Sequence, residues 1–269
     1  MSFVPVIPLG GVGGWTFLER TRARQEEAFQ ASPVLARRTA NFAERIGQVR
    51  SAEELVGDRR LLEVALGAFG LEDDLRNRFF IRKVLEEGTA SPAALANRLS
   101  DKRYLALAET FGFGDRPGGN VRRTGFAADV IARYRERQFE AAVGQSNPDM
   151  RLALSLSREI REIADRRLSN NGMWFTAMAS PPVRAVLERA LRLPAQVGAL
   201  DIDRQLSLFK ERAAARLGTS DFAALATAEG QDRLRQAFLT APATSGTSLG
   251  ARGAGALALL SRVAAGGLR

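Results

Sequence analysis

The sequence predicts an all-α, multihelical protein, and three observations lead to that prediction. Apolar residues recur along most of the chain at the spacing of an amphipathic helix. Signals that begin and end helices recur between these stretches, with Ser, Asp or Asn before them and Gly after them. No segment alternates β-branched and polar residues as a half-buried strand would. The chain has 269 residues, of which 45% are hydrophobic and 26% charged, and this length suffices for one large domain or two small ones.

Residues 1–14 are predicted to form an extended N-terminal arm. Pro5, Pro8 and the GGVGG segment at 10–14 oppose both a helix and a central strand. The alternative is a glycine loop that cradles a phosphate, but the preceding strand and the lysine that such loops use are missing. The segment also has no basic leader before an unbroken apolar run, so a secretory signal peptide is not expected.

Residues 15–240 are predicted to form the multihelical domain. Its first helix is expected to begin at Trp15, with Trp15 and Phe29 on one side. Trp15 and Phe17 are candidate interaction residues. A second helix is expected from about residue 32 to residue 46, because its Ser-Pro start places proline at the first helical position.

Helix boundaries are marked by residues that satisfy free backbone groups. Ser51 and Glu54 form a capping box, and Asp58 can cap the helix that follows. Gly70 suits the left-handed conformation in which many helices end. Further starts are predicted at the Ser-Pro or Asn-Pro pairs that begin at residues 91, 147 and 180, and further helices over residues 202–217 and about 231–239.

Two aromatic residues, Phe79 and Phe80, lie in an amphipathic helix expected over residues 72–86. Aromatic side chains at helical spacing could line a ligand pocket. The need of each helix for an apolar stripe favours a place in the core. A glycine-rich loop is then expected over residues 112–124, and it contains the adjacent pair Arg122 and Arg123.

Parts of the sequence resemble one another. The segment DRRLLEVALGAFGL at 58–71 is similar to DKRYLALAETFGF at 101–113, with one residue of slip before the shared Phe-Gly. The similarity indicates duplicated helical units, with sub-units over residues 51–113 and 180–240, or shared amphipathic spacing without duplication. Both explanations remain open at this stage.

Residues 241–269 form a low-complexity tail rich in Ala, Gly, Ser and Thr, and a flexible linker is expected at its start. Leu257 and Leu260 belong to a short apolar stretch that could dock on a partner or a membrane surface. The alternative is a frayed terminus, which the surrounding glycines favour.

The residue inventory argues against an enzyme. The chain contains no histidine and no cysteine, which removes the usual nucleophilic pairs and nearly all zinc, haem and iron–sulfur ligands. The adjacent acids of the sequence are explained by helix starts, helix ends and solvated faces. We therefore assign no catalytic, cofactor-binding or metal-binding residue and expect no cofactor. No run approaches the roughly 18 apolar residues of a membrane span.

The net charge of +9 raises the question of an anionic partner. Many arginines alternate with acids, as in the REIRE segment at 158–162, and such patterns are typical of a solvated helix face with surface ion pairs. Nucleic acid is therefore not the favoured partner. Binding of nucleic acid or another anionic surface stays the alternative function, with Arg122 and Arg123 as candidate contacts.

Four motifs carry a family resemblance: GWTFLERT at 14–21, DRRLLEVALGAFGL at 58–71, FIRKVLEEGT at 80–89 and FGFG at 111–114. Over most of residues 1–240, the chain resembles an alphaproteobacterial family of unknown function whose members are commonly encoded among flagellar genes. The resemblance implies a multihelical fold and a link to motility, and it transfers no catalytic residue. The resulting expectation is a non-enzymatic protein that acts by protein–protein contact in bacterial motility or flagellar assembly. Its expected location is the bacterial cytoplasm, or the flagellum after export without a cleavable signal.

Overall fold

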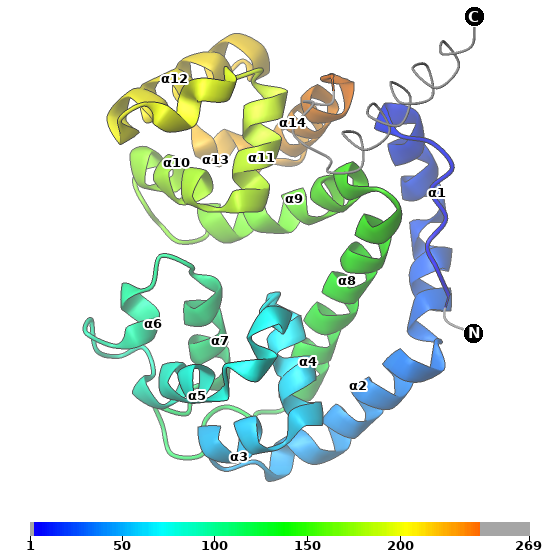
Figure 1. Cartoon of the computed structure of the whole chain (residues 1–269), viewed down its shortest axis with the longest axis vertical. Coiled ribbons are helices and arrows are strands. Elements are labelled where there is room, and N and C mark those ends of the chain that lie inside the picture. The colour runs from blue at the N-terminus through cyan, green and yellow to red at the C-terminus, as the bar shows by residue number, and fades with distance from the viewer. Residues whose placement is uncertain (1–2, 243–269) are drawn as a thin grey trace, which may run out of the picture.

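The computed structural model describes residues 3–242, and this part of the chain is all-α, as the sequence predicts. It contains fourteen α-helices and three short 3-10 helices, and no strand occurs within it (Figure 1). The helices gather around two main hydrophobic cores, and the groups of helices around them are called here the first and the second lobe.

The first lobe surrounds a core built between Leu35 and Tyr134. Its elements are α2 (Pro33–Arg45), η1 (Ile46–Gln48), α3 (Ala52–Gly57), α4 (Arg59–Phe69), η2 (Glu72–Arg76), α5 (Arg78–Glu87), α6 (Leu95–Arg98), α7 (Arg103–Phe111) and the first half of α8 (Phe126–Ser146).

The second lobe surrounds a core that joins Leu18 to residues 139–239. Its elements are α1 (Gly11–Gln30), the second half of α8, α9 (Pro148–Ala164), α10 (Asn170–Ala179), α11 (Pro181–Ala190), η3 (Ala195–Ala199), α12 (Ile202–Leu217), α13 (Phe222–Leu225) and α14 (Ala228–Thr240).

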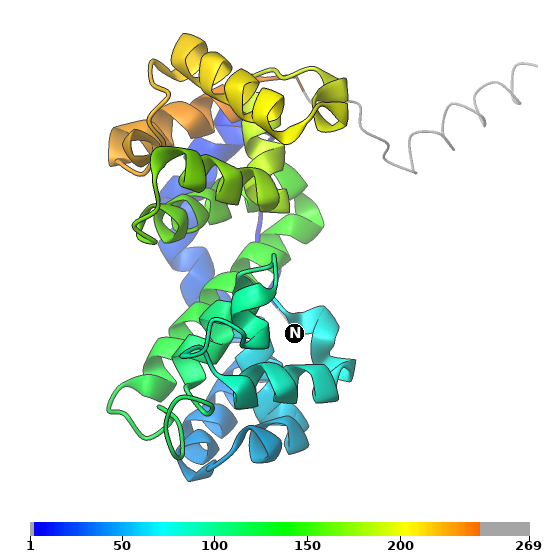
Figure 2. The same cartoon turned by 90° about the vertical axis from the view of Figure 1, so that its left-hand side faces the viewer.

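The long helix α8 joins the two lobes. Val130 and Tyr134 on its first half are buried in the first core, whereas Phe139 and Val143 on its second half are buried in the second core. Figure 2 shows α8 running from one lobe to the other. Because a single helix contributes to both cores, its rigidity helps to set how the lobes are placed.

The predicted side-chain caps at Asp58 and Asn147 are present, and each binds backbone N–H groups two or three residues further along the chain. The Asp58 carboxylate accepts hydrogen bonds from the backbone N–H groups of Arg60 and Leu61 at the start of α4. Asn147 caps α9 in the same way through the N–H of Met150. Gly70 ends α4 with φ +70°, a left-handed conformation that glycine adopts without steric cost.

The two similar segments fold alike. Residues 58–71 form α4, which ends at Gly70, and residues 101–113 form α7, which ends at Gly112 in the same left-handed conformation. Both helices pack in the first core, whereas residues 180–240 lie in the second. Each core also recruits helices outside residues 51–113 and 180–240.

The start of the first helix corrects one prediction. Helix α1 begins at Gly11, inside the segment 1–14 expected to be extended, and the Gly14 N–H already donates to the Gly10 carbonyl oxygen. A Cβ at Gly14 would lie 2.0 Å from the Leu9 carbonyl oxygen. The glycines therefore let the helix begin directly against the chain that precedes it.

The part of the arm before α1 is extended and is held by one buried side chain. The amide of Gln25, which is 7% exposed, accepts from the Val6 N–H at 2.8 Å and donates to the Val6 carbonyl at 3.1 Å. This pairing replaces the backbone hydrogen bonds that an isolated extended segment lacks.

Phe79 corrects a second prediction, because this residue is 81% exposed rather than buried in the core. The expected helix over residues 72–86 is interrupted: η2 ends at Arg76 and α5 begins at Arg78. The buried side of α5 is set by Ile81, and a residue two positions away points to the opposite side of a helix. Phe80 packs edge-on against Tyr104, with the two ring centroids 5.1 Å apart.

The Ser-Pro pair at residues 91–92 also behaves differently from its prediction. It lies in a turn, and the helix between this pair and α7 is the four-residue α6. The Asn97 side chain donates to the carbonyl groups of Thr89 and Ser91. These bonds satisfy the turn without a helix.

Candidate functional site

Arg122 and Arg123, the adjacent arginines singled out in the sequence, lie at the rim of an open groove. The groove has a volume of about 750 Å³ and runs between the end of α2 with η1 on one side and the start of α8 on the other. It therefore joins segments about 80 residues apart in the chain.

The loop before α8 is anchored so that the two arginines face solvent. Val121 before them and Phe126 after them are buried, and the Phe126 ring packs edge-on against Phe111 at 5.3 Å. Gly125 turns the chain into α8 with φ +83°, a conformation that costs other residues energy. Two apolar anchors and one glycine thus place the guanidinium groups at the surface.

The floor of the groove is apolar and made mostly of small residues. Ile46 and Val121 are buried beneath it, and Ile131 is half-buried. The remaining uncharged lining residues are Ala43, Gly47, Gly125, Ala127, Ala128 and Ala132. Small side chains leave the helix backbones close to the surface, so an apolar partner can approach them closely.

The charge along the groove has one sign. Arg122, Arg123 and Arg135 line it, and none of its lining residues carries a carboxylate. Arg123 donates to Asp129 at 2.6 Å, but both side chains are more than half exposed, so the pair is screened by water and worth little.

Arg135 is poorly satisfied at the other end of the groove. Its Nη2 reaches the Thr39 hydroxyl only at 3.5 Å, and its Nε is buried without a hydrogen-bond partner among the described residues. A buried N–H group without an acceptor costs free energy. The buried Nε cannot be reached from outside, but the rest of the half-buried guanidinium lines the groove and adds a positive charge at this end without an ion-pair partner among the described residues.

The other sequence-predicted interaction residues lie elsewhere. Trp15 is half-buried, with the Arg235 guanidinium carbon 4.6 Å from its ring centroid, and Phe17 is half-buried on the same helix. The start of α1 and the start of α8 lie at opposite ends of the molecule (Figure 1). The structure therefore does not bring these residues together with the groove. Leu257 and Leu260 lie outside the described residues.

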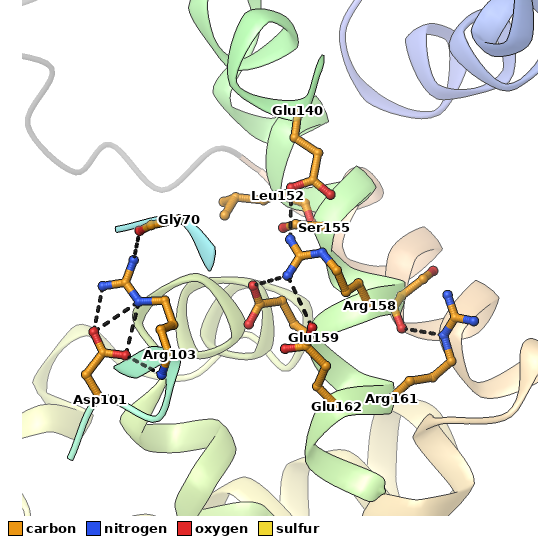
Figure 3. A network of polar contacts seen from close by, with 11 residues as sticks. Gly70, Asp101, Arg103, Glu140, Leu152, Ser155, Arg158, Glu159, Arg161 and Glu162 are labelled. Atoms are coloured by element: carbon orange, nitrogen blue, oxygen red, sulfur yellow. Dashed lines mark hydrogen bonds and ion pairs between the residues drawn. The ribbon is translucent and has the colours of Figure 1, made fainter. Parts of the chain in front are cut away.

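A buried ion-pair cluster at α8 and α9 was missed by sequence reasoning. Arg158 is only 13% exposed and contacts Glu140 at 2.9 Å and Glu159 at 3.0 Å, with Glu162 at 3.8 Å. Figure 3 shows these side chains beside the Asp101–Arg103 pair, whose arginine also donates to the Gly70 carbonyl. The REIRE segment therefore does not form a wholly solvated face.

The electrostatics of this cluster follow from burial. Burial raises the pKa of the Glu140 carboxyl, although the adjacent Arg158 opposes that rise. The pKa of Arg103 is raised first by its hydrogen bond to Asp101, and Glu159 adds to the effect from α9. The ion pairs of Arg158 lie within the second lobe and the Asp101–Arg103 pair within the first, and both sets have a structural role.

A second, smaller hollow of about 250 Å³ lies near Thr89 and Asp115. The Asp115 carboxylate accepts from the Thr89 N–H at 2.8 Å, the Thr89 hydroxyl at 2.9 Å and the Ala90 N–H at 2.9 Å. The backbone hydrogen bond from Thr89, with that from Ala90, holds the pKa of this carboxyl below its ordinary value. The Asp115 carboxylate therefore uses its hydrogen bonds to hold the turn before α6.

Within residues 3–242, no three acidic, histidine or cysteine side chains gather where they could hold a metal ion. The same part of the chain contains no helix that is both long and apolar enough to cross a bilayer.

Comparison with known proteins gives a family and a fold. A family model described as a protein of unknown function (DUF1217) matches residues 68–230, more than half of the chain. The crystal structure of protein AGR_C_984 from Agrobacterium tumefaciens is similar with a TM-score of 0.71 and 27% identity, over 88% of this chain and 96% of that one. No curated protein matches the chain.

Proposed function

The chain belongs to the DUF1217 family, and from that premise we propose that it acts without catalysis, by protein–protein contact at the groove between α2 and α8. One observation carries the proposal: an open apolar groove of about 750 Å³ has a rim of three arginines and no acid. Apolar surface with a polar rim is the usual make-up of a protein-binding patch.

The apolar floor distinguishes this groove from an active site. Its lining residues include no nucleophile and no general base, and elsewhere the buried Arg158 is paired with Glu140 and Glu159. The driving force available at the groove is therefore burial of apolar area together with charge complementarity.

The biological setting we propose is bacterial motility or flagellar assembly. This part of the proposal is supported by the family resemblance of the motifs at 14–21, 58–71, 80–89 and 111–114. It places the protein in the bacterial cytoplasm, or at the flagellum after export without a cleavable signal, with a flagellar protein as partner.

The test fills the groove without disturbing a core. Ala128 is exposed and lines the groove, so Ala128→Trp should obstruct docking, whereas Ala215→Trp on an exposed position of α12 is a matched control. We expect a gene deletion and strains with Ala128→Trp to swim poorly in soft agar, and the control to swim normally. Normal swimming and normal flagella after deletion would refute the motility setting.

The alternative function, binding to nucleic acid or another anionic surface, is supported by the three guanidinium groups at one groove and the net charge of +9. It predicts an affinity that falls steeply as salt rises. The apolar floor offers nothing to a phosphate backbone, so we favour a protein partner. Absence of DNA binding at low salt would end this alternative.

A further inference from the structure

We infer that the groove between α2 and α8 accepts one kind of segment: an amphipathic helix of about three turns with acidic residues at both ends of its apolar stripe. The inference rests on the proposed function and deepens it by naming the chemistry of the partner. It is carried by the shape of the floor and by the positions of the three arginines.

The floor is suited to a helix. Its walls are themselves helical, from α2 and from α8, and helices pack with their axes about 8–10 Å apart when the contact residues allow it. Ala43 on α2 and Ala128 and Ala132 on α8 line the groove as exposed alanines. A third helix can therefore lay Leu or Ile side chains between the two walls.

The length of the partner follows from the spacing of the charges. Gly125, directly before α8, and Arg135, the last lining residue within α8, both border the groove. Ten helical residues span about 15 Å, which equals about three turns of a docked helix. Arg122 and Arg123 lie at one end of this span and Arg135 at the other. We therefore expect the docked helix to carry acidic residues at both of its ends.

The arginines select acidic residues because two of them have little counter-charge within the chain: Arg123 pairs with Asp129 only at the exposed surface, and Arg135 has no ion pair among the described residues. The Nη2 contact of Arg135 with the Thr39 hydroxyl, at 3.5 Å, is at the limit of a hydrogen bond. Guanidinium groups form their strongest hydrogen bonds with carboxylates, often as bidentate pairs.

Charge also excludes two other occupants. The chain's own tail has the apolar residues Leu257 and Leu260, but residues 243–269 carry three arginines and no acid. A second copy placed groove to groove would bring two sets of arginines together. Like charges opposed in an interface disfavour it.

The probes are three synthetic peptides of about 14 residues with the same Leu and Ala stripe and with Glu, Gln or Lys at the remaining positions. Fluorescence anisotropy measures their binding to the full chain at low and at physiological salt. We expect the Glu peptide to bind about tenfold or more tighter than the Gln peptide at low salt, the Lys peptide to bind most weakly, and the differences to shrink as salt rises.

Variants of the chain assign the binding to the groove. The pair Arg122→Glu and Arg123→Glu should weaken the Glu peptide about tenfold or more and strengthen the Lys peptide. The control pair, Arg20→Glu and Arg212→Glu, changes the net charge equally at exposed positions of α1 and α12 and should leave both affinities almost unchanged.

Groove filling supplies a test that is independent of charge. Ala128→Trp from α8, or Ala43→Trp from the α2 wall, should abolish binding of the Glu peptide. Two variants on opposite walls keep the test valid if one of them fails to fold, which circular dichroism would reveal.

The inference is overturned if the Glu and Lys peptides bind equally, if neither binds, or if a short DNA duplex displaces the Glu peptide. Its failure is distinguishable from failure of the proposed function. If Ala128→Trp stops swimming while no preference for acidic peptides appears, the groove is a docking site for a partner of other chemistry. If the Glu peptide binds as expected but Ala128→Trp strains swim normally, the recognition chemistry stands and the motility setting fails.

Discussion

Replacement of Arg158 by methionine removes the cation from the most buried ion-pair cluster within residues 3–242. Its partner Glu140 is 7% exposed at the side chain and lies 2.9 Å from Arg158. Breaking a buried ion pair by removing one partner typically costs about 3–5 kcal/mol. Because Arg137 also lies close enough to attract the Glu140 carboxylate, and because Arg158 retains some solvent contact, we expect a loss near the lower end, about 3 kcal/mol.

The loss of stability in Arg158→Met should depend on pH, because the Glu140 carboxyl stays buried without its cation. Burial already raises the pKa of Glu140, and Arg158 opposes that rise, so the Arg158→Met variant should raise it further. The folded variant then binds a proton at Glu140 more tightly than the unfolded chain does. Its stability therefore increases as pH falls through the raised pKa, and the deficit seen near pH 8 should shrink toward pH 5.

Denaturant unfolding followed by far-UV circular dichroism measures both effects. A loss of about 3 kcal/mol corresponds to a fall in the melting temperature of roughly 6–12 °C for a domain of this size. Arg161→Met is the matched control, because Arg161 is exposed on the same helix and only bonds the Ser157 carbonyl. The double variant Arg158→Met with Glu140→Leu should recover part of the loss, since the Glu140 carboxylate is no longer buried without Arg158, although Arg137 loses its attraction to that carboxylate. A loss below about 1 kcal/mol, or one that is the same at both pH values, would refute the reasoning.

Three further predictions concern the backbone and the core. Arg192 lies in the turn just after α11 and has φ +51°. Arg192→Gly should therefore stabilise the fold by about 0.5–1 kcal/mol in denaturant unfolding, because relief of left-handed strain exceeds the added freedom of the unfolded chain; a destabilised variant would contradict this. Phe79→Ala should change the free energy of unfolding by less than about 0.5 kcal/mol. Ile81→Ala, on the buried side of α5, should lower that free energy by about 2–5 kcal/mol. Equal effects of the two substitutions would show that α5 is oriented differently. Gly14→Ala should loosen the arm and speed amide exchange at Val6, because its Cβ would lie 2.0 Å from a carbonyl oxygen. Gly13→Ala is the control, because its Cβ would meet its nearest atom at 3.8 Å; equal exchange rates at Val6 in the two variants would contradict the role of Gly14.

Local signals account for the parts of the fold that the sequence predicted well. A cap at Asp58 or Asn147 needs only the N–H groups two or three residues ahead, and the end of α4 needs only a residue that tolerates a positive φ at Gly70. Such interactions stay within one turn of helix, so the residue types in one short segment suffice to predict them. The same holds for the paired helices α4 and α7, whose similar sequences end in the same left-handed glycine.

Local signals were not sufficient where a segment's neighbours decide the outcome. The pattern around Phe79 fitted one long helix, but the chain breaks between η2 and α5, and the aromatic ring turns to solvent. The prolines and glycines before Trp15 favoured an extended arm up to residue 14. The contact of Gly14 with the preceding carbonyl lets α1 begin at Gly11 instead.

The sequence by itself determined that this protein is built from capped amphipathic helices, and it singled out Arg122 and Arg123 as exposed charges in a loop. Only the tertiary structure decided that these arginines border an apolar groove, because the opposite wall comes from α2, some 80 residues earlier. It likewise decided that Arg158 is buried against Glu140 rather than solvated. Periodicity and capping are properties of neighbouring residues, whereas burial and the local electric field depend on side chains that folding brings from distant parts of the chain.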